Sequence, residues 1–295
     1  MIYFFAALFL FIVFDMVRGY IPAKNKKNYL VKNITLLTIV FIALFLFGPF
    51  FLLSPIKLGY SALQEGNITL YYPGNRIDVA SEIMGIAKEA NRINESFYKR
   101  PIQEKVLVVF SDFDMLRFGA PPGADGAGTP FGINVKAGRA TLPVLTHEMS
   151  HRNLPKVVGI TKSNLSFPRW FDEGLASYLG KMDYYKTLND LQVDLKEGRY
   201  KKDITNWRGL PGMFQWQYLV IWSRNRNPKL LYGQVYQMTK YLFDKYGEEK
   251  VYQVIVKTKE MKFEEAFKET FGVSEEDFHN EFINYLYNYS SLKPS

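Results

Sequence analysis

The sequence predicts an α+β domain preceded by one or two N-terminal transmembrane helices. Apolar residues dominate the first 56 positions, as is typical of membrane spans. A β-rich run at Ile68–Tyr72 is followed by a helical pattern from Asp78, its expected N-cap, to about Tyr98, and then by a buried strand at Lys105–Ser111. Three or four helical patterns fill the chain after Pro168, so we expect a mixed α/β half followed by a helical half.

Composition and charge exclude several classes of function. The 295 residues are 47% hydrophobic and 22% charged, which suffices for one globular domain and an anchor. The chain has no cysteine, so disulfides, thiolate metal sites and cysteine nucleophiles are excluded. Its formal charge is +8, but residues 1–59 hold six basic side chains against Asp15, which leaves about +3 for the rest. We therefore expect no nucleic acid partner.

The segment 34–56 is the predicted membrane span. It is apolar apart from Thr35, Thr38 and Ser54. As a helix it would be about 30 Å long, which matches the hydrocarbon core of a bilayer. A buried helix of a soluble protein would show a recurring polar face, and Leu36–Leu53 shows none. We therefore expect the lipid bilayer to be a partner of this helix.

The segment 1–17 is equally apolar but shorter. It is either a second span or an artefact of the start site, because a later start would leave a basic stretch before one long apolar run, as in an uncleaved signal anchor. We assign 1–57 to a membrane anchor and 60–295 to a soluble domain. Both versions leave the lysine-rich stretch 18–32 in the cytoplasm, so the domain is expected on the extracytoplasmic side of the cell membrane.

Short elements are expected before the central motif of the domain. Asp112–Phe118 has the pattern of a short helix. Gly119–Gly132 is too rich in glycine and proline for regular structure, so it is read as a loop, either a connector or a flap, with the connector favoured. Ile133–Val135 is then expected as a brief strand and 142–153 as a helix. A further loop is expected near 204–212.

The motif His147-Glu148-Met149-Ser150-His151 could bind a metal ion. On a helix its two imidazoles lie about 40° apart around the axis and one turn apart along it, so both can reach one zinc ion. Glu148 projects beside the ion, where its carboxylate could take a proton from bound water. Metal-assisted hydrolysis requires this arrangement. The alternative is a chance match, which usually lacks a helical context and a third ligand.

Glu173 is the expected third ligand. It lies in a helical pattern that begins near Pro168 and has an apolar stripe. Gly174 in the middle of this pattern suggests close packing of the helix, so Glu173 would face inward. A buried carboxylate is costly unless it is paired or bound to a metal. Asp172 is the competing ligand, although it would point off this face.

Two sequence motifs together resemble the gluzincin clan of zinc metallopeptidases, especially its peptidase-MA-like members. They are HEMSH, from His147 to His151, and the run WFDEGLASYL, whose Glu173 follows His151 with 21 residues between them. The signature of these peptidases is HExxH on one helix and W-x-x-E-G-x-A-x-Y on a later one. The resemblance implies a zincin (thermolysin-like) fold and one Zn²⁺ ion held by His147, His151 and Glu173. It also implies that Glu148 is the general base and that the substrate is a peptide or protein.

The resemblance further suggests a catalytic tyrosine. Such families often carry one in a Y-x-Q-like context on a later helix, where it stabilises the oxyanion of the tetrahedral intermediate. Leu231-Tyr232-Gly233-Gln234 resembles that context, so Tyr232 is the candidate and Tyr236, one turn on, is the alternative. The chain contains 20 tyrosines, so a chance match is a strong competing explanation.

Two further expectations concern other residues. The brief strand at Ile133–Val135 would correspond to the edge strand with which gluzincins pair extended substrates. His279 is expected to be an ordinary residue on a helix surface.

Three other classes of function compete. A non-catalytic surface binding or scaffold protein could retain the fold, although it would not need Glu148. An intramembrane protease is disfavoured because Arg152 and Asn153 make the motif's surroundings polar. A polybasic protein that binds anionic lipid or nucleic acid is suggested by net charge alone.

Overall fold

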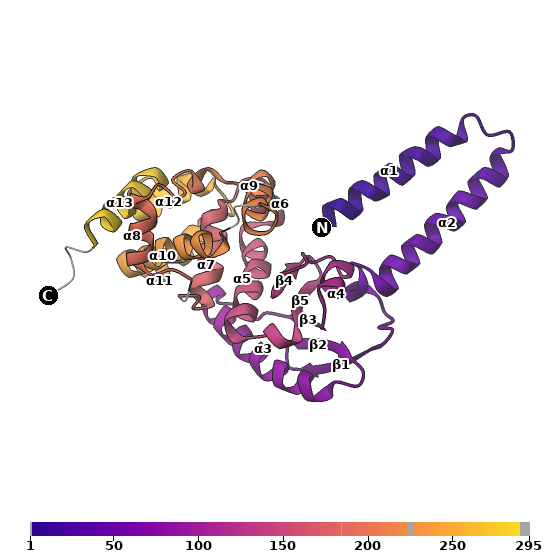
Figure 1. Ribbon diagram of the computed structural model, residues 1–295, viewed down its shortest axis with the longest axis horizontal. Helices are drawn as coiled ribbons and strands as arrows, with labels where there is room; N and C mark the ends of the chain where they lie inside the picture. Colours follow the sequence, from indigo (N-terminus) through magenta and orange to yellow (C-terminus); the bar gives the residue numbers. More distant parts are fainter. Residues whose placement is uncertain (1, 184, 224–226, 290–295) are drawn as a thin grey trace. The chain divides into compact units, whose positions relative to one another are not determined.

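The computed structural model describes residues 2–183, 185–223 and 227–289 (Figure 1). The chain forms two compact units. Unit 1 comprises Met1–Ile86 and Gln103–Ala140, and unit 2 comprises Ala87–Ile102 and Thr141–Ser295. Helices together with a five-stranded sheet give the mixed α+β architecture that the sequence predicts. The division into an anchor at 1–57 and a domain at 60–295 stays a prediction.

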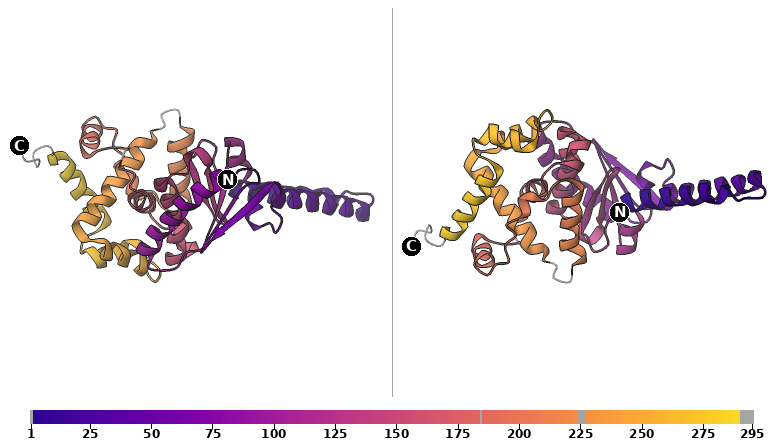
Figure 2. Two further views of the ribbon diagram at one scale, coloured as in Figure 1. Left: turned by 90° about the horizontal axis from the view of Figure 1, so that it is seen from below. Right: turned by 90° about the horizontal axis from the view of Figure 1, so that it is seen from above.

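Unit 1 begins with two helices, α1 (Ile2–Tyr20) and α2 (Lys26–Phe47), which lie side by side and antiparallel (Figures 1 and 2). The side chain of Asn25 caps α2 by accepting the Asn28 N–H at 3.0 Å. None of α2 is buried, and its mean hydropathy is 2.3 over 18 residues. Among the described residues α2 is the one helix long and apolar enough to cross a membrane, a test that a signal sequence would also pass.

The boundaries of α2 differ from the expected span at 34–56. The helix ends at Phe47 because a residue before proline is driven out of the helical region, and Gly48, before Pro49, is extended at φ −116° and ψ −160°. Beyond this stop, Phe51 and Leu52 lie in a short 3₁₀ helix and are buried in a small core of unit 1. Phe51 and Leu52 therefore belong to the core of unit 1 instead of extending α2, whereas Leu53 and Ile56 are exposed.

The sheet of unit 1 has the order β1-β2-β3-β5-β4. Its three inner strands are parallel and its two outer strands are antiparallel to them. The helix α3 (Ile77–Tyr98) connects β2 to β3, as a parallel crossover requires, and α4 (Asp112–Arg117) follows β3. The strands are β1 (Tyr60–Glu65), β2 (Ile68–Pro73), β3 (Glu104–Val109), β4 (Gly126–Thr129) and β5 (Gly132–Lys136).

Three expectations about unit 1 are wrong. The strand expected at the edge, β5, lies between β3 and β4, so β4 is the edge. Strand β4 lies inside Gly119–Gly132, the stretch expected to be a loop. It forms despite its glycines because its hydrogen bonds to β5 use backbone groups and not side chains. Helix α3 begins at Ile77, which places Asp78 in its first turn instead of at the N-cap.

Unit 2 is helical and contains more helices than the three or four expected after Pro168, including a π-helix at Tyr218–Trp222. Short helices occupy parts of the chain that composition marked as loop, including the start of α9. The α-helices are α5 (Leu142–Val158), α6 (Ile160–Leu165), α7 (Arg169–Leu179), α8 (Leu188–Lys196), α9 (Gly209–Gln217), α10 (Pro228–Tyr246), α11 (Glu248–Lys257), α12 (Phe263–Phe271) and α13 (Glu275–Asn288).

Helix α7 lies at the centre of unit 2, packed against both α5 and α10 (Figure 1). Its side chains Trp170, Phe171 and Leu175 are fully buried. At Gly174 an added Cβ would lie 2.1 Å from Oγ1 of Thr239 and 2.8 Å from the carbonyl oxygen of Val235, both on α10. This glycine therefore permits the close approach of two helices that its place in the sequence suggests.

Candidate metal centre

Helix α5 places two imidazoles on one face. Thr141 caps the helix by accepting the Val144 N–H. Pro143 lies in the first turn, where backbone N–H groups have no acceptor within the helix, so its lack of an N–H breaks no helical hydrogen bond. One turn separates His147 from His151, and their Nε2 atoms lie 3.0 Å apart. His147 is buried and His151 is partly buried. The pair is therefore held in the interior of unit 2.

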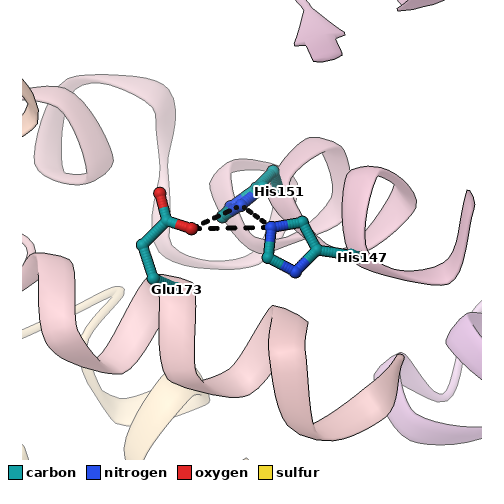
Figure 3. Close-up of side chains that lie close together, drawn as sticks. All are labelled: His147, His151 and Glu173. Atoms are coloured by element: carbon teal, nitrogen blue, oxygen red, sulfur yellow. Dashed lines mark hydrogen bonds and ion pairs between the residues drawn. The ribbon is translucent and has the colours of Figure 1, made fainter. Parts of the chain in front are cut away.

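Helix α7 adds Glu173 to this pair (Figure 3). Its Oε2 lies 3.5 Å from Nε2 of His147 and 3.3 Å from Nε2 of His151. Ligand atoms of a tetrahedral ion with bonds of about 2.0 to 2.1 Å lie about 3.3 to 3.4 Å apart, so the three atoms have the spacing of one tetrahedral face. Oε2 is buried and has no hydrogen-bond donor among the described residues. The three side chains could therefore bind a metal ion.

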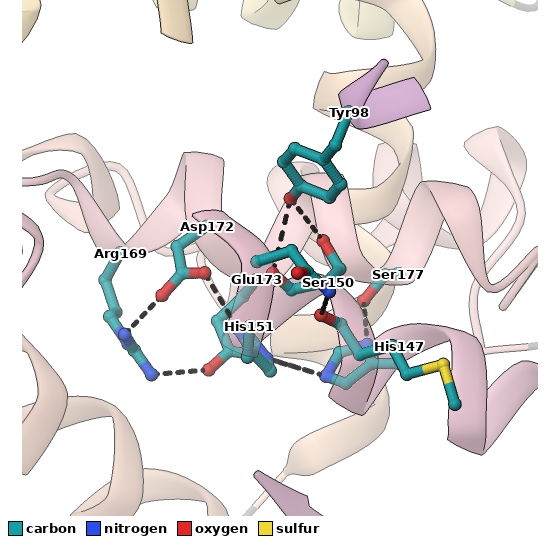
Figure 4. A network of polar contacts seen from close by, with 10 residues as sticks. Tyr98, His147, Ser150, His151, Arg169, Asp172, Glu173 and Ser177 are labelled. Atoms are coloured by element: carbon teal, nitrogen blue, oxygen red, sulfur yellow. Dashed lines mark hydrogen bonds and ion pairs between the residues drawn. The ribbon is translucent and has the colours of Figure 1, made fainter. Parts of the chain in front are cut away.

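The far side of each imidazole also has a polar partner (Figure 4). Asp172 places Oδ1 at 2.8 Å from Nδ1 of His151, and Oγ of Ser177 lies 3.5 Å from Nδ1 of His147. A carboxylate accepts the Nδ1–H of His151, which leaves the Nε2 lone pair directed at the cluster. Asp172, the competing ligand, thus lies behind His151 and not among the three converging atoms.

Arg169 holds both acidic residues of α7. Its Nη2 donates to Oε1 of Glu173 at 3.0 Å, and its Nη1 donates to Oδ2 of Asp172. One oxygen of Glu173 is thus bound by the guanidinium, while the other faces the histidines (Figure 4). This division favours a single metal bond from Glu173, through Oε2.

The charges around the cluster favour a cation within it. Burial opposes ionisation of Glu173, but the charges of His151 and Arg169 outweigh burial and hold its pKa well below the ordinary value. Burial also opposes a charge on His151, and there Asp172 and Glu173 raise the pKa well above the ordinary value. Two ionised carboxylates thus attract positive charge to His151, and a divalent ion among the ligand atoms would satisfy the same field.

Glu148 lies on α5 beside His147 and is partly exposed. Tyr232, on α10, has its ring centroid 5.9 Å from that of His147. Burial, followed by the charge of Glu173, raises the pKa of Tyr232 well above its ordinary value, so its hydroxyl keeps its proton at neutral pH. Tyr236 instead packs on Tyr178, with ring centroids 6.3 Å apart. Of the two candidate tyrosines, Tyr232 is therefore the one in ring contact with the cluster.

Two aromatic rings hold Tyr232 in place. Tyr185 stacks on it with centroids 5.3 Å apart and planes 21° apart. Trp216, from α9, meets it edge-on at 5.2 Å and 80°. The ring beside His147 is therefore fixed by its neighbours instead of being free to rotate.

Several residues that support the cluster were not predicted from the sequence. Arg169 precedes Asp172 and Glu173 by three and four positions, a helical ion-pair spacing that could have indicated it. At the end of α3, Oη of Tyr98 lies 2.9 Å from Oγ of Ser150, and Nδ2 of Asn94 donates to the Thr146 carbonyl at 3.1 Å. These contacts brace α5, and no sequence spacing could have revealed them.

His279 differs from its expected position on a helix surface. It is buried on α13, and its Nε2 lies 3.2 Å from Oη of Tyr200. Burial lowers its pKa to about 4, so it is neutral at pH 7. Its surroundings are those of a core residue, separate from the three-residue cluster.

No protein-family model matches the chain, and no curated protein matches it.

Proposed function

We propose that the chain is a membrane-anchored zinc metallopeptidase of the gluzincin clan, with a zincin-type fold, that hydrolyses peptide bonds. The observation that carries the proposal is the convergence of His147, His151 and Glu173 at 3.0 to 3.5 Å, with Glu148 adjacent on the same helix. Three protein ligands with one open position are typical of catalytic zinc sites, whereas structural zinc sites usually have four protein ligands.

Zinc is the ion that best fits the ligand set. Two imidazoles and one carboxylate oxygen, with no thiolate in the chain, match the His₂Glu sites of zinc hydrolases. Magnesium and calcium prefer six or more oxygen ligands, and the cluster supplies one. Zn²⁺ bound here would act as a Lewis acid and would lower the pKa of a water molecule in its open position to ~7.

The protein residues then have distinct roles. Glu148 takes a proton from the attacking water and passes it to the leaving amine. Tyr232 donates its hydroxyl proton in a hydrogen bond to the oxyanion that develops on the peptide carbonyl. Asp172 fixes the tautomer of His151, and Arg169 orients Glu173. Ser177, whose Oγ lies 3.5 Å from Nδ1 of His147, has no assigned role.

The location of the protein is part of the proposal. The apolar helix α2 would anchor the chain in the cell membrane. Lys24, Lys26, Lys27 and Lys32 lie at or near its start, so the positive-inside rule places this end in the cytoplasm and the catalytic unit on the extracytoplasmic side.

The substitution Glu148→Gln tests the catalytic role directly. We expect it to abolish cleavage of a peptide library, read by mass spectrometry, while metal analysis still finds one zinc per chain. Glu276→Gln on α13 is the matched control, because it makes the same chemical change at an exposed position in the same unit. Cleavage by the Glu148→Gln protein at the wild-type rate would overturn the proposal.

A non-catalytic binding or scaffold protein with the same fold is the second candidate. It would bind zinc but cleave nothing in the library. Because a protein without turnover needs no general base, the presence of Glu148 beside His147 favours the peptidase.

A further inference from the structure

Helix α9 and the π-helix that continues it are apolar on two opposite sides. Phe214, Tyr218 and Trp222 are spaced four residues apart, so they lie along one side, and they are 54%, 58% and 65% exposed. Trp216 lies on the other side and is buried. A helix on the surface of a soluble protein normally turns charged side chains to water, yet no charged residue occurs in 209–223.

Helix α6 adds more apolar surface next to α9. The two helices pack together, and the Gly209 N–H donates to the Phe167 carbonyl at 3.0 Å where the segments meet. Ile160 and Leu165 of α6 are 70% and 63% exposed. The apolar patch is defined by Ile160, Leu165, Phe214, Tyr218 and Trp222. Exposed apolar residues concentrated on adjoining helices in this way mark a surface that contacts something other than water.

The two sequence segments that carry the apolar patch lack acidic residues. The segments 149–171 and 204–243 contain no aspartate or glutamate. Two arginines of these segments form ion pairs inside the protein. Arg169 pairs with the carboxylates of α7, and Arg208 pairs with Glu264 and Glu275. Lys162, which donates to backbone carbonyls, and Lys229 add positive charge to these segments. These two segments of the sequence are therefore net basic, and a negatively charged surface complements them, although Glu260 and Glu265 line a hollow beside Lys162 and Ser166 at α6.

We propose that the apolar patch contacts the surface of an anionic lipid bilayer, with the rings of Tyr218 and Trp222 at the level of the headgroups. Tyrosine and tryptophan concentrate at this depth because one end of each ring system is apolar and the other is polar. Exposed apolar side chains in a basic, acid-free segment are the composition of interfacial helices. A candidate span, α2, belongs to the same chain, so the protein itself would be attached to a membrane. The contact is independent of metal binding and of hydrolysis.

Tryptophan fluorescence offers a direct test, because Trp222 is exposed while Trp170, Trp207 and Trp216 are buried. The full chain is placed in nanodiscs of phosphatidylglycerol and phosphatidylcholine, or mixed with vesicles of this composition if it does not insert. Quenching by brominated lipid and by aqueous acrylamide is then measured. Trp222→Phe removes the exposed reporter, so the difference between the two proteins isolates its signal.

We expect brominated lipid to quench the Trp222 signal and acrylamide to quench it only weakly. Phe214→Glu should reverse this order, whereas Val256→Glu, at an exposed position on α11 outside the patch, should not. With phosphatidylcholine alone the quenching by brominated lipid should fall severalfold. Strong acrylamide quenching without a lipid effect would overturn the proposal, and so would protection from both quenchers, which would mean that protein covers the patch. Equal quenching in neutral lipid would overturn the preference for anionic lipid.

Discussion

Oδ1 of Asp172 lies 2.8 Å from Nδ1 of His151, on the side of the imidazole that faces away from His147 and Glu173. The carboxylate thereby fixes which nitrogen of His151 carries the proton. The orientation of a metal ligand thus depends on the residue next to Glu173 in the sequence, so a single turn of α7 supplies both a ligand and the support for another ligand.

Asp172→Asn should weaken zinc binding about 10- to 100-fold, because an amide is a weaker acceptor for the Nδ1–H and carries no charge. Competition with a zinc chelator measures the affinity. Asp244→Asn is the control, since Asp244 is an exposed carboxylate of α10. Unchanged zinc affinity in the Asp172→Asn protein would show that Asp172 does not support the ligand.

Tyr232→Phe should lower kcat about 10²- to 10³-fold with little effect on zinc content, since it removes one donor to the oxyanion. Tyr236→Phe should leave kcat near the wild-type value, because Tyr236 packs on Tyr178 and not on His147. Steady-state kinetics with a peptide found in the library digest distinguishes the two. A larger loss from Tyr236→Phe would reverse the assignment.

The parts of the site that follow from local periodicity could be read from the sequence. His147 and His151 are one helical turn apart, so any helix brings them together. The prediction of Glu173 depended on a further inference, that Gly174 marks close packing of its helix. The structure shows this close packing, because Thr239 of α10 leaves no room for a side chain at Gly174. The positions of Arg169 and Tyr98 depend on how separate helices meet, and helical spacing alone does not determine this.

The same distinction explains the differences in the fold. The edge strand β4 was missed because glycine-rich segments have low strand propensity, and the pairing with β5 overrides it. Helix α2 ends at Phe47 because Pro49 follows Gly48. The span predicted at 34–56 ran past this proline because the residues around it are continuously apolar. His279 lies in the core because neighbouring helices cover it, although its sequence context is charged.

Gly174→Ala should destabilise unit 2 by about 1 to 3 kcal/mol, because the new methyl group would overlap Thr239 and the Val235 carbonyl and would force α7 away from α10. Zinc affinity should fall as well, since Glu173 moves with α7. Gly85→Ala is the control. Gly85 lies inside α3 with open space around it, so that change should stabilise the helix by about 0.5 to 1 kcal/mol. Urea unfolding of the full chain in mild detergent measures both.

The buried imidazole of His279 should make the protein less stable as the pH falls. Burial lowers its pKa to about 4 in the folded chain, against an ordinary value of about 6.5 when unfolded. Between these values the unfolded chain binds a proton that the folded chain does not, so the free energy of unfolding decreases as the pH falls through this window and levels off below about 4. The full effect is on the order of 3 kcal/mol.

His279→Gln removes this titration while the amide can still form a hydrogen bond with Tyr200. As the pH falls from about 6.5 to about 4, the wild-type protein should therefore lose unfolding free energy relative to the His279→Gln protein. Above pH 7 the difference between the two proteins should stay constant. Urea unfolding at a series of pH values measures it. Parallel pH profiles for the two proteins would contradict this prediction. They would mean that His279 has the same pKa in the folded and unfolded chains, so that burial beside Tyr200 does not destabilise its protonated form.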